Sequence, residues 1–311
     1  MRATWLRSCG TVAAGLLLCL GLPHAFAQQV NMMVTAQNPD PKVLPTLGVW
    51  QNGKLTLVSS SFPNVPGFTC DSWCYESAVE FLSARALEGG RLELRHRLQE
   101  APQALLVTTV TPEPGAVEFV ARVEQAEGAT AELPARVLTP NLCWQLRRAE
   151  GFASAPDPYP EFVKRCFIFT DKGMTFLDQT VRKKIPCRPP DHEYNNPPWV
   201  QMYVGAWQQI PRVTATSWAD YSPDRYATTV IGAVSRDRKY LAAIANDSAT
   251  LMAQAWHDCL HNNPAWLPPQ APVTERVWRV RIYARLDDPK ALLARVAKDF
   301  PSARPVPGLS P

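Results

Sequence analysis

The stretch R-V-W-R-V-R-I-Y-A-R-L, residues Arg276–Leu286, alternates apolar and polar side chains along its length. This alternation is typical of a β-strand with one face in a core, because successive side chains of a strand point to opposite faces. The face predicted to be buried carries Trp278, Val280, Ile282 and Ala284, and the opposite face carries Arg279, Arg281, Tyr283 and Arg285. The stretch therefore predicts a half-buried strand with a solvated arginine stripe.

The same period of two recurs elsewhere, bounded by turn signals such as Asp171-Lys172-Gly173. Further strands are predicted at Lys54–Val58, Leu105–Val110, Ala116–Glu124, Cys166–Thr170, Thr228–Val234 and Tyr240–Ala245. The segment Asp71–Leu87 fits either a helix or a strand, and its pattern leaves the choice open.

A helix is predicted directly after the strand Arg276–Leu286. Asp287 or Asp288 can cap its N-terminus and Pro289 suits its first turn. Its apolar face consists of Leu292, Leu293, Val296 and Phe300. Many strands, few helices and no strand-helix-strand rhythm predict an all-β fold, a large antiparallel β-sandwich with a short C-terminal helix.

This layout ends in the strand Trp278–Leu286, an acidic cap and a helix over Asp288–Phe300. In that respect the chain resembles the galactose mutarotase-like supersandwich of sugar-active bacterial proteins. The resemblance rests on layout, without a diagnostic motif, and covers most of residues 40–300. Epimerases of that family use a histidine acid and a carboxylate base at the sugar ring. Neither position can be matched here, so the resemblance implies a sugar-active fold and assigns no catalytic residue.

Residues 1–27 have the features of a secretory signal peptide. Arg2 and Arg7 precede an apolar run over Thr11–Leu22, and Ala25-Phe26-Ala27 forms a small-x-small cleavage site. The apolar run is shorter than the roughly 20 residues of a membrane-spanning helix. We therefore expect a periplasmic or secreted protein with no membrane span, in which residues 28–311 form a single β-sandwich domain.

The charge and cysteine content of the expected mature chain narrow its partners. Of 32 basic residues, 30 remain without Arg2 and Arg7, against 28 acidic residues, so the net charge is about +2. This balance gives no reason to expect nucleic acid as a partner. Six cysteines remain, and an even number in an exported chain predicts disulfides whose pairing the sequence leaves open. They are Cys70, Cys74, Cys143, Cys166, Cys187 and Cys259.

A candidate sugar-binding strand is predicted over Trp199–Ile210, W-V-Q-M-Y-V-G-A-W-Q-Q-I. One of its faces is apolar apart from Gln208. The other combines flat rings with amides, which suit the C–H faces and hydroxyls of a sugar. This platform consists of Trp199, Gln201, Tyr203, Trp207 and Gln209, and Trp218, Tyr221 and Tyr226 follow closely. In the alternative interpretation the same face is buried, with its rings in a core and its amides bonded to backbone.

Two other features suggest sugar chemistry. His96 lies in the apolar row of R-L-E-L-R-H-R-L, where it is either a core histidine or an acid/base group at the end of a row. Arg279, Arg281 and Arg285 form the stripe described above, and forked hydrogen bonds from them would suit a carboxylated sugar. The alternative for this stripe is an ordinary solvated strand face.

The segment W-H-D-C-L-H, residues 256–261, lies one methylene away from the zinc-peptidase signature H-E-x-x-H. On a helix spanning residues 248–261, His257 and His261 would share a face and could bind one metal ion. Asp258 is short for a base that activates water, and Asn262-Asn263-Pro264 stop the helix at once. We therefore expect no metal or other cofactor. Cys259 is predicted to tether the segment by a disulfide, and Trp256 and His257 to reach the mouth of a cleft.

Three functional hypotheses follow from these patterns. The first is an exported protein that binds or transforms carbohydrate, neutral or carboxylated, on the Trp199–Gln209 platform, with His96, His257, Asp258 and His261 as the candidate catalytic groups. The second is a non-catalytic structural or interaction protein with the same rings in its core. The third is a metal-dependent hydrolase that uses H-D-x-x-H. Whether the protein is an enzyme is left open.

Overall fold

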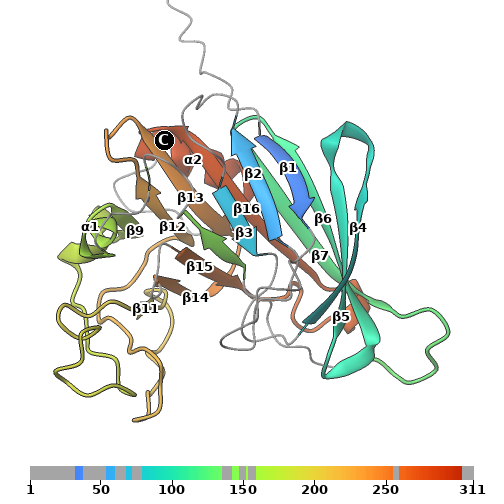
Figure 1. Ribbon diagram of the computed structural model, residues 1–311, viewed down its shortest axis with the longest axis horizontal. Helices are drawn as coiled ribbons and strands as arrows, with labels where there is room; N and C mark the ends of the chain where they lie inside the picture. Colours follow the sequence, from blue (N-terminus) through green and yellow to red (C-terminus); the bar gives the residue numbers. More distant parts are fainter. Residues whose placement is uncertain are drawn as a thin grey trace, which may run out of the picture.

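The computed structural model describes residues 32–37, 54–59, 68–71, 79–134, 142–146, 152, 159–254 and 259–302. These residues form an all-β fold of two antiparallel sheets in a sandwich-like arrangement, with a short helix near the C-terminal end (Figure 1). The predicted fold class is confirmed. None of the helices in these residues has the length and apolarity to span a bilayer.

The larger sheet has nine strands. In spatial order they are β10 (Gly173–Phe176), β9 (Cys166–Thr170), β12 (Val230–Val234), β13 (Tyr240–Asn246), β16 (Val277–Leu286), β7 (Ala116–Gln125), β6 (Ala101–Glu113), β5 (Leu92–Leu98) and β4 (Val79–Ala86). The strands β4 to β7 form a consecutive meander that extends to the right in Figure 1. Because β4 covers Val79–Ala86, the later part of the undecided segment Asp71–Leu87 is a strand.

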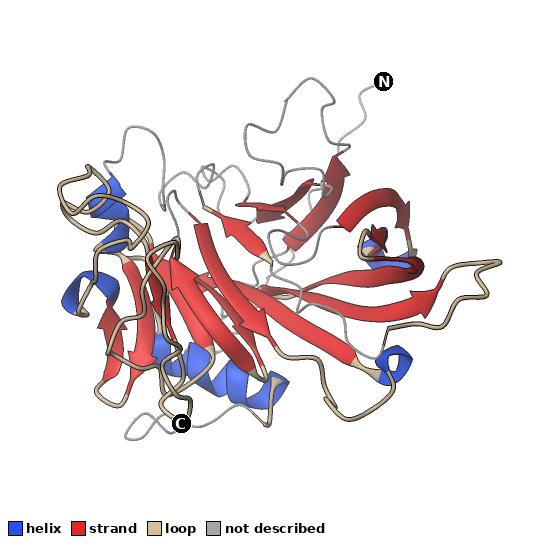
Figure 2. Cartoon of the chain, turned by 90° about the horizontal axis from the view of Figure 1, so that it is seen from below, coloured by secondary structure: helices blue, strands red, loops and turns tan. Residues whose placement is uncertain are grey.

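The second sheet has seven strands. In spatial order they are β1 (Met32–Gln37), β2 (Lys54–Ser59), β3 (Phe68–Asp71), β8 (Cys143–Gln145), β15 (Cys259–Pro264), β14 (Ala249–Gln254) and β11 (Gln201–Tyr203). Short helical elements complete the described chain: α1 (Tyr159–Val163), α2 (Pro289–Asp299) and the 3-10 turns η1 (Glu88–Gly90), η2 (Leu177–Gln179) and η3 (Val273–Glu275). Figure 2 shows α2 lying against the strands of the larger sheet.

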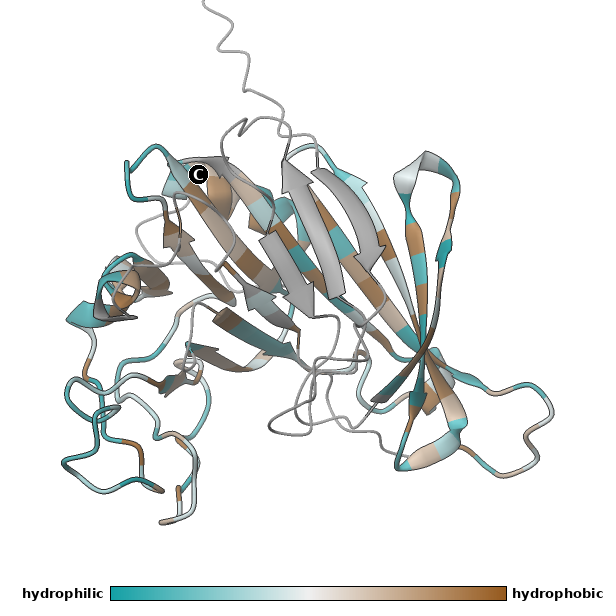
Figure 3. Cartoon of the chain, in the orientation of Figure 1, coloured by the Kyte–Doolittle hydropathy of each residue, from teal (hydrophilic) through white to brown (hydrophobic). Residues whose placement is uncertain are grey.

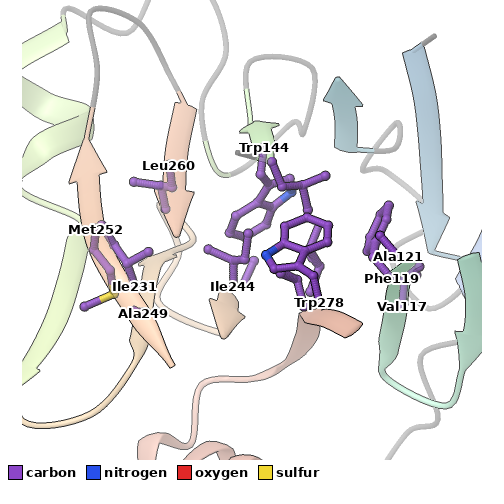
Figure 4. Close-up of a cluster of buried hydrophobic side chains, with 14 of the residues drawn as sticks. Val117, Phe119, Ala121, Trp144, Ile231, Ile244, Ala249, Met252, Leu260 and Trp278 are labelled. Atoms are coloured by element: carbon purple, nitrogen blue, oxygen red, sulfur yellow. The ribbon is translucent and has the colours of Figure 1, made fainter. Parts of the chain in front are cut away.

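The core between the sheets is built by the alternation that the sequence displays. On β16 the predicted inner residues Trp278, Val280, Ile282 and Ala284 have no exposed surface. Trp144 on β8 and Leu260 on β15 enter the same cluster from the seven-stranded sheet (Figure 4). Each large ring or branched chain removed from water here contributes about 1.5–3 kcal/mol. The strand prediction for Arg276–Leu286 is therefore confirmed, starting one residue later.

The second face of β16 is covered by α2, which corrects the prediction of a solvated stripe. The Asp288 carboxylate accepts a hydrogen bond from Ala291 N at 2.9 Å and caps the helix as expected. Leu292, Leu293, Val296 and Phe300 pack with Tyr283 of β16 in a second apolar cluster. The amphipathic helix needs a partner for its apolar face, and the strand before it supplies that face.

Arg281 lies at the centre of an ion network between β16, β6, β7 and α2. Its guanidinium contacts the carboxylates of Asp299 at 2.8 Å, Glu113 at 3.0 Å and Glu118 at 3.0 Å. Arg279 also pairs with Glu118, at 2.6 Å. Burial opposes the charge on Arg281, but the three carboxylates outweigh it and hold its pKa above the usual value. Arg279 and Arg281 are therefore engaged within the fold, which leaves the stripe without support as a carboxylate-binding site.

Candidate functional site

Residues 180–229, here called the loop segment, include the short strand β11 and carry the candidate platform (lower left in Figure 1, yellow to light orange). The predicted strand Trp199–Ile210 is wrong over most of its length, because only Gln201–Tyr203 forms a strand, β11. This strand pairs with β14 at the edge of the seven-stranded sheet. Two isolated parallel bridges, Met202 to Tyr221 and Gly205 to Tyr226, hold the later part of the segment alongside β11.

Gln201 and Tyr203 lie inside the protein, with no exposed surface. The Gln201 side chain accepts from Lys183 N at 2.6 Å and donates to Asp220 O. The Tyr203 hydroxyl hydrogen-bonds Thr180 Oγ1 at 2.8 Å and receives a bond from Arg182 at 3.3 Å. Burial raises the pKa of the Tyr203 phenol. Neither side chain can contact a ligand in this arrangement, so both are removed from the predicted platform.

The remaining platform residues lie nearer the surface. Trp199 is half-buried and its ring stacks on Tyr194, with ring centroids 4.4 Å apart. Gln209 is exposed. Trp207 retains 37% of its surface and lies within a turn closed by a bond from Gln208 N to Gly205 O at 2.9 Å. The predicted face is therefore divided between interior and surface, and Trp207 is the ring that it presents to solvent.

The indole of Trp207 is held by its neighbours on two sides. Its six-membered ring lies so close to the Gly205 backbone that a Cβ placed there would be 2.6 Å from both Cε2 and Cζ2. Only glycine permits this approach, because real Cβ contacts do not occur at such distances. The indole and the Tyr226 ring form a T-shaped contact, with centroids 5.4 Å apart and planes at 80°. One aromatic surface is thus fixed in place while part of it stays open to solvent.

Gln208 fixes the backbone beneath this ring. Its Oε1 accepts from Gly205 N at 2.6 Å and from the Tyr226 hydroxyl at 3.0 Å. Its Nε2 donates to Thr250 O of β14 at 3.2 Å. The Tyr226 hydroxyl also reaches Ala249 O at 3.0 Å, and burial raises the pKa of this phenol. Gly205, Gln208 and Tyr226 together therefore form a rigid support for Trp207.

Trp218 is the second exposed tryptophan, with 44% of its surface accessible. It adjoins a turn in which Thr214 N donates to Ser217 Oγ at 3.0 Å. Among the residues that the structure describes, no aromatic ring packs against it. Trp218 is therefore exposed without the support that Trp207 has. Figure 3 shows the loop segment as largely hydrophilic with isolated apolar positions.

His96 lies on β5 in the nine-stranded sheet and has no exposed surface. Its ring meets Phe81 of β4 edge-on, with centroids 5.4 Å apart. This placement matches the core alternative for His96 and separates it from the loop segment, which borders the other sheet.

His261 lies on β15, and the helix considered for residues 248–261 is wrong because β14 and β15 occupy its two ends. His261 is 3% exposed, and its Nε2 lies 3.1 Å from Cys259 Sγ. In the sheet register His261 faces Cys143, which faces Asp71. Trp256, His257 and Asp258 lie outside the described residues.

Metal ligation and disulfide bonding can be considered only for part of the chain. Within the described residues, no group of three His, Cys, Asp or Glu side chains is placed to hold a metal ion. Cys166 Sγ lies 3.3 Å from Phe162 O, and Cys187 is exposed. The disulfide predicted for Cys259 stays a prediction.

The sequence patterns did not single out Arg225, a cation of the loop segment. Arg225 is half-buried, and its Nε and Nη2 are buried without a hydrogen-bond partner among the described residues. The adjacent carboxylate of Asp224 instead accepts from Val181 N at 2.6 Å. Sequence periodicity cannot predict such a residue, because whether its nitrogens have hydrogen-bond partners depends on which side chains surround it in space.

Comparison with known proteins identifies no family. No protein-family model matches the chain, and no curated protein is similar to it in sequence. Among solved structures, the chain is similar to the Slr1438 protein from Synechocystis sp. PCC 6803, with 12% sequence identity and a TM-score of 0.32. The similarity covers 67% of this chain and 65% of that one, slightly less than two thirds of its length. A likeness of this degree implies neither a shared family nor a function.

Proposed function

We propose that this protein is an exported carbohydrate-binding protein that stacks a sugar ring on Trp207. The supported indole carries the proposal: it lies close against Gly205, it makes a T-shaped contact with Tyr226, and 37% of its surface is open. Sugars present apolar C–H faces that pack on such rings. A ring already fixed loses little side-chain entropy when a ligand binds, which favours affinity.

We propose that the protein binds a sugar, and we propose no reaction on that sugar. A sugar-transforming enzyme needs an acid and a base at the sugar, within hydrogen-bond reach of the reacting atoms. The described candidates, His96 and His261, are buried in different sheets. The resemblance in layout to galactose mutarotase-like proteins is in keeping with a sugar ligand, and the signal-like N-terminus with export.

The test is a titration of tryptophan fluorescence and of binding heat with neutral and acidic oligosaccharides. Wild-type protein should respond saturably to at least one of them. Trp207→Ala should weaken that binding at least tenfold, which corresponds to about 1.4 kcal/mol. Trp218→Ala is the matched control, because it removes an equally exposed but unsupported ring, and it should bind like wild type.

Two outcomes would contradict the proposal. The first is no response to any of the oligosaccharides, which favours a structural or interaction protein. The second is equal binding by wild type and Trp207→Ala, which would place any sugar site elsewhere.

A further inference from the structure

Arg225 differs from Arg281 and Arg182 in the partners of its guanidinium. Arg281 is buried against three carboxylates, and Arg182 donates to Pro198 O, Trp199 O and Gln254 Oε1. Arg225 has two buried nitrogens and, among the described residues, neither a hydrogen bond nor an ion pair. A charged donor removed from water without a partner is unfavourable for folding. A ligand that pairs with such a group is one explanation for it.

The backbone of Arg225 is close to Gly205, which lies beneath the Trp207 indole. Arg225 precedes Tyr226, which forms the bridge to Gly205. One bridge and one chain step separate Arg225 from Gly205, so their Cα atoms are within about 9 Å. The charge of Arg225 also acts on the Tyr226 phenol, where it opposes the rise in pKa that burial causes. Tyr226 thus contacts the indole of Trp207 and lies within electrostatic reach of the Arg225 guanidinium.

The buried, unpaired nitrogens of Arg225 are Nε and Nη2, and Nη1 is not among them. Nη1 is therefore the end of the guanidinium that reaches the surface. A carboxylate that approaches from solvent can bind Nη1 and, after a small rotation of the side chain, Nη1 and Nη2 together. A guanidinium binds planar carboxylates in this forked way more specifically than an ammonium does.

We propose that the Trp207 site selects carboxylated sugars, with Arg225 pairing the carboxylate of a uronic acid whose ring stacks on Trp207. This inference rests on the proposed sugar binding at Trp207. It moves the recognition of acidic sugar from the paired arginines of β16 to Arg225, which has no partner among the described residues.

The test compares ligands that differ only in charge. Oligomers of galacturonate, glucuronate and mannuronate are titrated against the protein, each beside its neutral methyl ester, at low salt. Wild type should bind at least one acid form about tenfold more tightly than its ester. Arg225→Gln should make the two affinities equal by weakening only the acid form, and Arg225→Lys should keep part of the preference.

Arg212→Gln is the matched control, because it removes an exposed arginine of the same loop segment and should keep the preference. Trp207→Ala should weaken acid and ester alike. The melting temperature of Arg225→Gln should equal or exceed that of wild type, because the substitution removes a charge without a partner.

The two proposals fail in different ways. If no acid or ester binds, the sugar site at Trp207 is wrong and the inference fails with it. If acid and ester bind equally and depend on Trp207, only the inference is overturned. A preference that survives Arg225→Gln, or that Arg212→Gln also abolishes, overturns it as well.

Discussion

The sandwich and the loop segment fix their backbones in different ways. In β13, β16 and β7 each strand bonds to a strand on both sides, with regular antiparallel registers. In the loop segment, side chains hold the backbone: Gln201 bonds Lys183 N and Asp220 O, and Gln208 bonds Gly205 N and Thr250 O. The sandwich buries Trp144 and Trp278, and the loop segment presents Trp207. The difference indicates that the sandwich supplies stability and the loop segment the candidate site.

The sharpest contrast in stability is between Trp278 and Trp207. Trp278→Ala should lower the free energy of unfolding by about 3–5 kcal/mol, because it leaves a cavity in the core. Trp207→Ala removes a partly exposed ring and should cost about 1 kcal/mol or less. Urea unfolding followed by circular dichroism measures both, and similar losses for the two variants would show that the regions do not differ as described.

Substitutions in the ion network test how α2 is held on the sandwich. Arg281→Met should cost about 2–4 kcal/mol, less than a fully buried pair because Glu113 retains 27% side-chain exposure. Arg122→Met, which breaks an exposed pair with Glu124 on β7, should cost about 0.5 kcal/mol or less. Thermal or urea unfolding of both variants checks this, and a negligible effect of Arg281→Met would mean that the network does not fasten the helix.

The loop segment is expected to depend on buried amides. Gln201→Leu leaves Lys183 N and Asp220 O without their bonds and should cost about 1–3 kcal/mol. Gln209→Leu, at an exposed position of the same stretch, should change stability by about 0.5 kcal/mol or less. Hydrogen exchange at Lys183 N should speed up in the first variant alone. Unchanged protection there would contradict the role given to Gln201.

The smallest expected change in stability is at Gly205. A methyl group in Gly205→Ala would meet the Trp207 indole at 2.6 Å, and the ring can move outward because it lies at the surface. We expect a loss of about 1 kcal/mol or less, together with a shifted tryptophan emission and at least tenfold weaker sugar binding. Ala206→Ser, at the exposed next position, should leave the tryptophan emission and the sugar affinity unchanged. Full binding by Gly205→Ala would show that the position of the indole is unimportant.

Alternation predicted the sandwich well because it reports on burial, and burial builds this part of the fold. Val117, Phe119, Ala121 and Val123 face the core as their period of two requires. The same rule failed at Trp199–Ile210, where alternation continues through a turn at Gly205. Period two identifies two faces, but it does not show whether a neighbouring strand or a side chain satisfies the backbone.

The remaining misses have a similar cause. The sequence indicates both the arginine stripe of β16 and the apolar face of α2. It does not indicate that the helix covers the strand and that the arginines pair with carboxylates there. The isolation of Arg225 and the approach of Trp207 to Gly205 depend on distances between segments, which no single-sequence pattern contains. The part of the candidate site that the sequence did indicate is its chemistry, a flat ring beside amides.

The most direct test of the sugar-binding proposal follows individual tryptophans in fluorine NMR of protein labelled with fluorotryptophan. Trp207→Phe, Trp218→Phe and Trp278→Phe assign the three resonances. On titration with the oligosaccharide that binds, the Trp207 resonance should shift saturably while those of Trp218 and Trp278 stay in place. Binding that leaves Trp207 unmoved would contradict the proposal.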